Sequence, residues 1–173
     1  MDLVTDMPQL FPLMRGGGAF LALIGLGIAV GSLGSQKWRL VWLTIGFYLG
    51  IGAMAAGGIT KLIFEGLPYP AVWQWVVLGL AFAIEAVLVS IVLRRVKDRG
   101  SRQFWLWILF IVGAHFLVLG PSHGPICALL ALLCMGNALL GLRLKTLDLR
   151  VFWAVDGVLK LGAGIAMVAI SYA

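Results

Sequence analysis

The sequence predicts an all-α bundle of six membrane-spanning helices, and three observations lead to that fold class. Of the 173 residues, 62% are hydrophobic and only 12% are charged, so the chain has too little polar surface to cover a water-soluble globule. The apolar residues form six long runs, and a spanning helix needs about 20 mostly apolar residues. Lys and Arg gather in alternate connections between these runs. We therefore expect a single transmembrane domain over residues 1–173, with no separate soluble domain.

The first two spans are predicted over residues 16–34 and 38–64. The preceding segment lacks the positive start of a secretory signal peptide, so we expect it to be retained. Both spans contain small residues four apart, a spacing that lets helix backbones approach closely in lipid. These residues are Gly27 and Gly31 in the first span, and Gly46 and Gly50 in the second. Their spacing favours helix packing over any chemical role.

The remaining four spans are separated by short connections rich in turn residues or in charge. Gly and Pro mark the turns before the third and fifth spans. Cys127 and Cys134 are seven residues apart in the fifth span, about two helical turns, which is too far for a disulfide. We expect both cysteines to be small packing residues. The four spans are predicted over residues 71–93, 104–119, 124–142 and 149–171.

The positions of the basic residues predict how the chain is oriented. Ten Lys and Arg residues fall at the first, third and fifth connections, and the other connections have almost none. By the positive-inside rule these three loops are cytoplasmic, which places both termini outside the cytoplasm and requires an even number of spans. The seven tryptophans lie near predicted span ends, where indole rings prefer the headgroup region. The prediction is a multi-pass protein of the inner cell membrane. The ten basic residues are Lys37, Arg39, Arg94, Arg95, Lys97, Arg99, Arg102, Arg143, Lys145 and Arg150.

Ionisable residues inside the spans are the main candidates for a ligand or proton site, because such groups cost free energy in hydrocarbon. They are Glu85, His115, Asp156 and Lys160, and the amide of Asn137 joins them. At about 1.5 Å of helical rise per residue, Glu85, Asn137 and Asp156 lie roughly 9–13 Å from the cytoplasmic end of their helices. Lys160 lies one turn deeper.

The spacing of Asp156 and Lys160 predicts an ion pair, because residues four apart share one helix face. Glu85 then has no obvious partner unless it reaches Lys160 or Asn137, or takes up a proton. A carboxyl group that changes protonation is a candidate for transport. The alternative is that the cluster holds helices together, with a neutral Glu85 hydrogen-bonded to Asn137 or to a backbone carbonyl.

The fourth connection contains a second, weaker candidate in Ser122 and His123. A serine beside a histidine suggests nucleophilic catalysis, but adjacent residues do not form a triad and no third member is evident. Together with His115 these residues offer too few ligands for a metal site. We expect no metal and no cofactor. No complete catalytic set stands out, so the sequence favours a protein that is not an enzyme.

Two resemblances add to this interpretation. The run from Phe152 to Gly164, with Asp156 four residues before Lys160, resembles the last helix of microbial rhodopsins. That resemblance implies that Lys160 binds retinal and that Asp156 is its counter-ion. As a whole, with an outer His-Phe and a late Asp-Gly-x-x-Lys element, the chain resembles small uncharacterised bacterial membrane protein families with six helices. This second resemblance implies a fold and a location but no activity.

Three functional hypotheses follow from the buried charges. The first is a small permease or a transporter coupled to protons or ions, whose substrate is a small molecule or an ion. The second is a non-transporting accessory or assembly subunit, in which the charges specify packing. The third is a binder of retinal or another lipophilic cofactor through Lys160. The lipid bilayer is the expected partner in all three, with a homo-oligomer as a further possibility. No nucleic acid is expected, because the basic residues serve to orient the chain.

Overall fold

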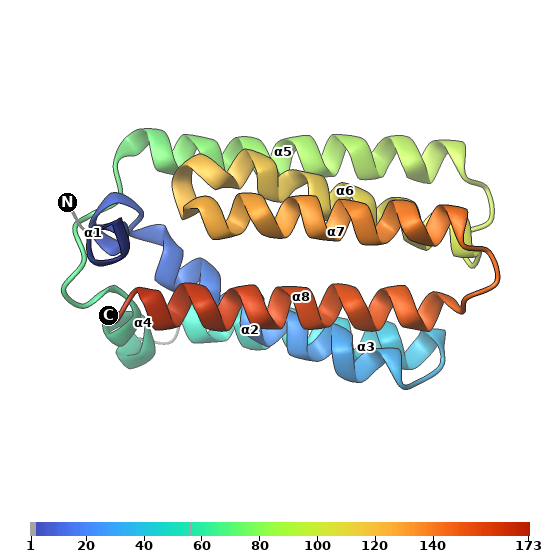
Figure 1. Ribbon diagram of the computed structural model, residues 1–173, viewed down its shortest axis with the longest axis horizontal. Helices are drawn as coiled ribbons and strands as arrows, with labels where there is room; N and C mark the ends of the chain where they lie inside the picture. The colour runs from blue at the N-terminus through green and yellow to red at the C-terminus, as the bar shows by residue number, and fades with distance from the viewer. Residues whose placement is uncertain (1–2, 56) are drawn as a thin grey trace.

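The computed structural model describes residues 3–55 and 57–173, and every regular element in these ranges is an α-helix (Figure 1). Five of the helices, α2, α5, α6, α7 and α8, are long and apolar enough to cross a membrane. The all-helical fold is therefore confirmed, and these five helices are candidate membrane spans. The helices are α1 (Leu3–Leu10), α2 (Leu13–Ser32), α3 (Gln36–Ala55), α4 (Gly57–Phe64), α5 (Val72–Arg95), α6 (Arg102–His123), α7 (Pro125–Arg143) and α8 (Leu149–Ile170).

The helix bounds differ from the predicted spans at three places. The predicted span 38–64 corresponds to two helices, α3 and α4, with residue 56 between them outside the described residues. A short helix, α1, precedes the first long one. Residues 120–123, predicted as a turn, form the last turn of α6, which contains Pro121. The chain reverses after it, at Gly124, whose φ is +95°. Only glycine adopts that backbone conformation without strain.

The long helices form two layers of three (Figure 1). In one layer α2 packs between α3 and α8, and in the other α6 packs between α5 and α7. Contacts between α7 and α8 join the layers. Buried apolar side chains from both layers fill the space between them, including Leu21 and Ile28 of α2, Phe116 of α6, Leu130 of α7 and Met167 of α8.

The closest helix pair, α2 and α8, is held together by glycines seven residues apart on each helix. A Cβ atom at Gly25 would lie 2.8 Å from the carbonyl oxygen of Gly157, and one at Gly18 would lie 2.9 Å from that of Gly164. Real Cβ atoms do not approach other atoms so closely. Only glycine therefore fits at these crossings, and the two backbones touch directly.

The four glycines predicted to pack helices lie where α2 meets α3. A Cβ atom at Gly27 would lie 3.0 Å from the Cα atom of Gly46, and one at Gly31 would lie 3.0 Å from the Cα atom of Arg39. Gly50 faces the ring of Phe20 instead. The first layer is therefore assembled on two glycine-lined faces of α2, one toward α3 and one toward α8.

Arg15 joins three chain segments at one end of the bundle. Its Nε donates to Ser171 Oγ at 3.0 Å and its Nη2 to the Ser171 carbonyl oxygen at 2.5 Å. Its Nη1 donates to the carbonyl oxygens of Ile63 and Glu65, at 3.3 and 2.9 Å. The guanidinium also lies 3.9 Å from the ring centre of Tyr172. Arg15 therefore connects the start of α2 to the ends of α4 and α8.

Arg102 makes a similar connection at the opposite end. Its Nη2 donates to the carbonyl oxygens of Gly141 and Leu144 at 2.8 and 3.0 Å, and its Nη1 donates to that of Leu147. These carbonyls belong to the end of α7 and the following loop, where helix carbonyls have no partner within the helix. Arg102 thus ties the start of α6 to the connection between α7 and α8.

Candidate functional site

Asp156 and Lys160 form the buried ion pair that their spacing predicts. Lys160 Nζ donates to Asp156 Oδ2. The side chain of Asp156 is 0% exposed and that of Lys160 is 1% exposed. The second carboxylate oxygen, Oδ1, has no hydrogen-bond partner in the described part of the chain. Because α8 packs against α2 through Gly157, the pair points toward the space between the two layers.

The neighbours of this pair come from the other layer. Lys160 Nζ lies 4.0 Å from the sulfur of Cys134 on α7 and 5.7 Å from the ring centre of Phe116 on α6. Asn137, also on α7, donates to the carbonyl oxygen of Phe152 at 2.8 Å. Asn137 therefore ties α7 to α8 and is committed to that backbone bond. The alternative in which it bonds Glu85 is not what the structure shows.

Glu85 of α5 contacts His115 of α6. The closest atoms, Glu85 Oε2 and His115 Nδ1, are 3.3 Å apart, without the alignment of a hydrogen bond. The histidine ring lies between aromatic neighbours, with ring centres 6.1 Å from Phe82 and 4.2 Å from Phe116. The side chain of Glu85 is 23% exposed, whereas that of His115 is 8% exposed. The pairing of these two residues was not predicted from the sequence.

The two pairs meet around Phe116. Its ring contacts His115 on one side and lies near Lys160 on the other, and the charge of Lys160 acts on both Glu85 and His115. Four predicted site residues from three helices, α5, α6 and α8, are therefore one electrostatic group, which we call the polar centre: Glu85, His115, Asp156 and Lys160. Asn137 borders this group.

Ser122 and His123 lie apart from the polar centre, at the end of α6. Ser122 Oγ and His123 Nδ1 are 2.8 Å apart, and both side chains are buried. Ser122 also donates to the carbonyl oxygen of Leu119 at 3.0 Å. With its single proton used there, the serine accepts a hydrogen bond from His123 Nδ1, which is the reverse of an activated nucleophile. His123 packs against Gly17 of α2.

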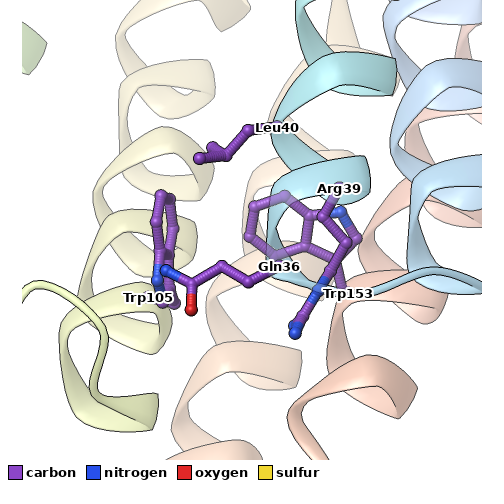
Figure 2. Close-up of a pocket in the computed structure, with 5 residues that line it drawn as sticks. All are labelled: Gln36, Arg39, Leu40, Trp105 and Trp153. Atoms are coloured by element: carbon purple, nitrogen blue, oxygen red, sulfur yellow. The ribbon is translucent and has the colours of Figure 1, made fainter.

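Sequence reasoning missed a pocket at the other end of the bundle, lined by Gln36, Arg39, Leu40, Trp105 and Trp153 (Figure 2). From the sequence, Arg39 is expected only to orient the chain, and the two tryptophans are expected only to lie at the headgroups. Nothing in their spacing indicates that three separate helices bring them together. Among the described residues, no group of three or more His, Cys, Asp or Glu side chains is placed to hold a metal ion.

Comparison with known proteins gives a family but no activity. A family model described as "Family of unknown function (DUF6609)" matches residues 8–173, which include every helix of both layers. No curated protein and no solved structure matches the chain. Because the match extends over nearly the whole chain, the protein belongs to the DUF6609 family, a family of unknown function.

Proposed function

We propose that this protein is a small transporter of the cell membrane that moves an ion or a small molecule together with a proton. The observation that carries the proposal is the contact between Glu85 and His115 beside the buried Lys160. Carboxyl and imidazole groups exchange protons, and ionisable groups within membrane spans typically mark proton or ion pathways. The substrate is a small charged or polar molecule, because a centre of ionisable groups attracts ligands of that class.

The proposed topology has six crossings with both termini outside the cytoplasm. The sixth crossing is α3, whose 20 residues extend about 30 Å, the thickness of the hydrocarbon core. Support comes from Figure 1, where α1 and the end of α8 lie at the same end of the bundle. An even number of crossings produces that arrangement. The basic loops, at the opposite end, are proposed to face the cytoplasm.

A proton on Glu85 would weaken the attraction that holds α5 in place. Glu85 is on α5, a helix at the edge of its layer whose extensive contacts, within the described residues, are with a single neighbour, α6. When the carboxyl group is neutral, its attraction to the charge of Lys160 is lost. Helix α5 is then free to shift relative to α6. A helix with two positions, selected by protonation, is the element that proton-coupled transport requires.

Proton flux into proteoliposomes tests this function. The purified protein is reconstituted with a pH-sensitive dye inside the vesicles, and a panel of ions and metabolites is added outside at two pH values. We expect at least one substrate to move protons in the wild type, and Glu85→Gln and His115→Gln to abolish that flux. Glu65→Gln, an exposed glutamate outside the polar centre, is the matched control and should retain it. Flux that is equal at both pH values and unchanged in Glu85→Gln would contradict the proposal.

One observation favours a second candidate, the accessory subunit. Only 6% of the central part of α5 is buried, against 39–50% for the other four candidate spans. A partner helix that covered α5 would also shield the partly exposed Glu85 from lipid. This candidate predicts that Glu85→Gln changes the thermal stability while no ligand does. Recovery of the protein as a monomer, without any co-purifying partner, would count against it.

A further inference from the structure

Helix α5 is packed into the bundle along its first half only. Its two buried residues, Gln74 and Ala81, both lie in that half. Ala81 belongs to the apolar core near the end of the bundle that holds α1, and Leu78 packs against the same core. The second core, which includes Leu106 and Trp153 near the opposite end, has no residue of α5 among its described members. The second half of α5 therefore lies beside the bundle without entering its core.

The start of α5 is also tied to another helix by hydrogen bonds. Gln74 is buried, and its Nε2 donates to the carbonyl oxygen of Leu10, the last residue of α1, at 3.2 Å. Its Oε1 accepts a hydrogen bond from the backbone N–H of Ala71, at 2.9 Å, at the N-cap of α5. In Figure 1, α1 and the start of α5 lie at the same end of the bundle. Gln74 therefore joins the first turn of α5 to α1 and holds this end of the helix in place.

The opposite end of α5 has no comparable tie within the described part of the chain. Arg94 and Arg95 are exposed. In the loop that follows, the Asp98 carboxylate accepts a hydrogen bond from the backbone N–H of Gly100 at 2.9 Å, and the Asp98 carbonyl oxygen accepts one from Ser101 Oγ at 2.7 Å. Both hydrogen bonds are local to the loop. This end of α5 is therefore attached to the bundle only through α6 and the loop that leads to it.

Glu85 makes the polar contact that joins the second half of α5 to its neighbour. Glu85 Oε2 lies 3.3 Å from His115 Nδ1 of α6, and the charge of Lys160 attracts the carboxylate. The other polar side chain of this half within the span, Ser90, donates to the carbonyl oxygen of Ala86 in the same helix at 2.7 Å. Glu85 is therefore the residue that holds this half of α5 against α6.

A small tilt of α5 has a large effect on that contact. At about 1.5 Å of rise per residue, Glu85 lies about 16 Å from Gln74 along the helix, and Leu93 lies about 28 Å from it. A tilt of about 10° about Gln74 therefore moves Glu85 by about 3 Å and Leu93 by about 5 Å. A movement of about 3 Å roughly doubles the separation of Glu85 and His115.

From these observations we infer that α5 is a gate that pivots at Gln74, and that its second half swings away from α6 to open His115 toward the basic end of the bundle. Hinged elements of this kind move about a few fixed residues at one end. The attraction between the Glu85 carboxylate and the charge of Lys160 holds the gate closed. Gln74 is a positioning residue, because it fixes one end of α5 without touching the polar centre. The inference rests on the proposed function, to which it adds the pivot and the side from which a proton reaches the centre.

Distances between spin labels at the two ends of α5 test the inference. The two native cysteines, which are buried, are replaced by alanine in the full chain, and label pairs are placed at exposed positions of α5 and α8. Leu93→Cys with Val151→Cys reports the basic end, and Val72→Cys with Ile165→Cys reports the end that holds α1. We expect Glu85→Gln to shift the first distance by about 5 Å and the second by less than about 1 Å. Equal shifts at both ends, or no shift at either end, would overturn the inference.

Two further variants separate a gate from a general loosening of α5. Ser90→Ala removes a hydroxyl that is bonded only within α5, so it is the matched control and should leave both distances unchanged. Gln74→Leu removes the tie to α1 and should broaden the distance distribution of the Val72 pair. A wild-type distribution for that pair in Gln74→Leu would refute the pivot.

The distances are measured without a substrate, so their outcome is independent of the flux assay. A tilt of α5 in a protein that moves no protons would contradict the proposed function and leave the hinge in place. Proton flux through a protein whose α5 does not tilt would contradict the gate and leave the proposed function in place.

Discussion

Replacing Lys160 by methionine should destabilise the protein by about 3–5 kcal/mol, because it leaves the carboxylate of Asp156 buried without its cation. The reasoning starts from burial, since the two side chains are 0% and 1% exposed. Cys134 also lies within hydrogen-bonding reach of Asp156, but a neutral thiol is a weak donor and does not replace the charge of the lost ammonium group. A loss of this size changes the folding equilibrium by two or more orders of magnitude.

The double variant Asp156→Leu with Lys160→Met should recover most of that stability. Replacing both members of a buried pair by apolar groups of similar size removes the cost of desolvating two charges, and is typically neutral or stabilising by about 1–4 kcal/mol. Reversible unfolding in mixed micelles, followed by tryptophan fluorescence, measures both variants against the wild type. Lys61→Met, which removes an exposed lysine, is the control and should change stability by less than about 0.5 kcal/mol.

The result that would refute this reasoning is a Lys160→Met variant as stable as the wild type. That outcome would mean that Asp156 does not depend on Lys160 for its burial. The double variant separates the two proposed functions as well. If the double variant is stable but no longer moves protons, the Asp156–Lys160 pair takes part in transport. If the double variant assembles and behaves like the wild type, the pair serves helix packing.

The remaining predictions concern the packing of α8, the hydrogen bonds of Arg15 and the Ser122 hydroxyl. Gly157→Ala should destabilise the protein by about 1–3 kcal/mol through overpacking, because its Cβ would lie 2.9 Å from the Cα atom of Ala29. Gly162→Ala, on the same helix with open space around it, should be neutral or stabilising by up to about 1 kcal/mol in the same thermal unfolding assay. Arg15→Lys should lower stability by about 1–3 kcal/mol because a lysine cannot reproduce the forked set of hydrogen bonds. Ser122→Ala should leave proton flux unchanged and cost about 1 kcal/mol, whereas loss of flux would assign the hydroxyl a role that its bond to the Leu119 carbonyl does not suggest.

The sequence predicted those parts of the fold and site that depend on spacing within one helix. Hydropathy located all five helices that qualify as spans, and the four-residue spacing of Asp156 and Lys160 placed both on one helix face. Over the predicted span 38–64 the structure describes α3 and α4, on either side of residue 56.

Contacts between helices could not be predicted, because they depend on which faces meet. The sequence left Glu85 without a firm partner, whereas the structure places it against His115. Depth estimates did not reveal this, since two groups at similar depth can lie on opposite sides of a bundle. The pocket at Arg39 was missed for the same reason, because Arg39, Trp105 and Trp153 come from three helices and are at least 48 residues apart along the chain.

The glycine contact between α2 and α8 also bears on the order in which the bundle is made. Helix α8 follows α2 by more than 100 residues, so the face of α2 that carries Gly18 and Gly25 meets only lipid or other helices until α8 has been made. The layer of α5, α6 and α7 consists of consecutive helices and is free to assemble earlier. Insertion of α8 then becomes the step that closes the fold, and a chain that stops before Leu149 leaves that glycine face uncovered.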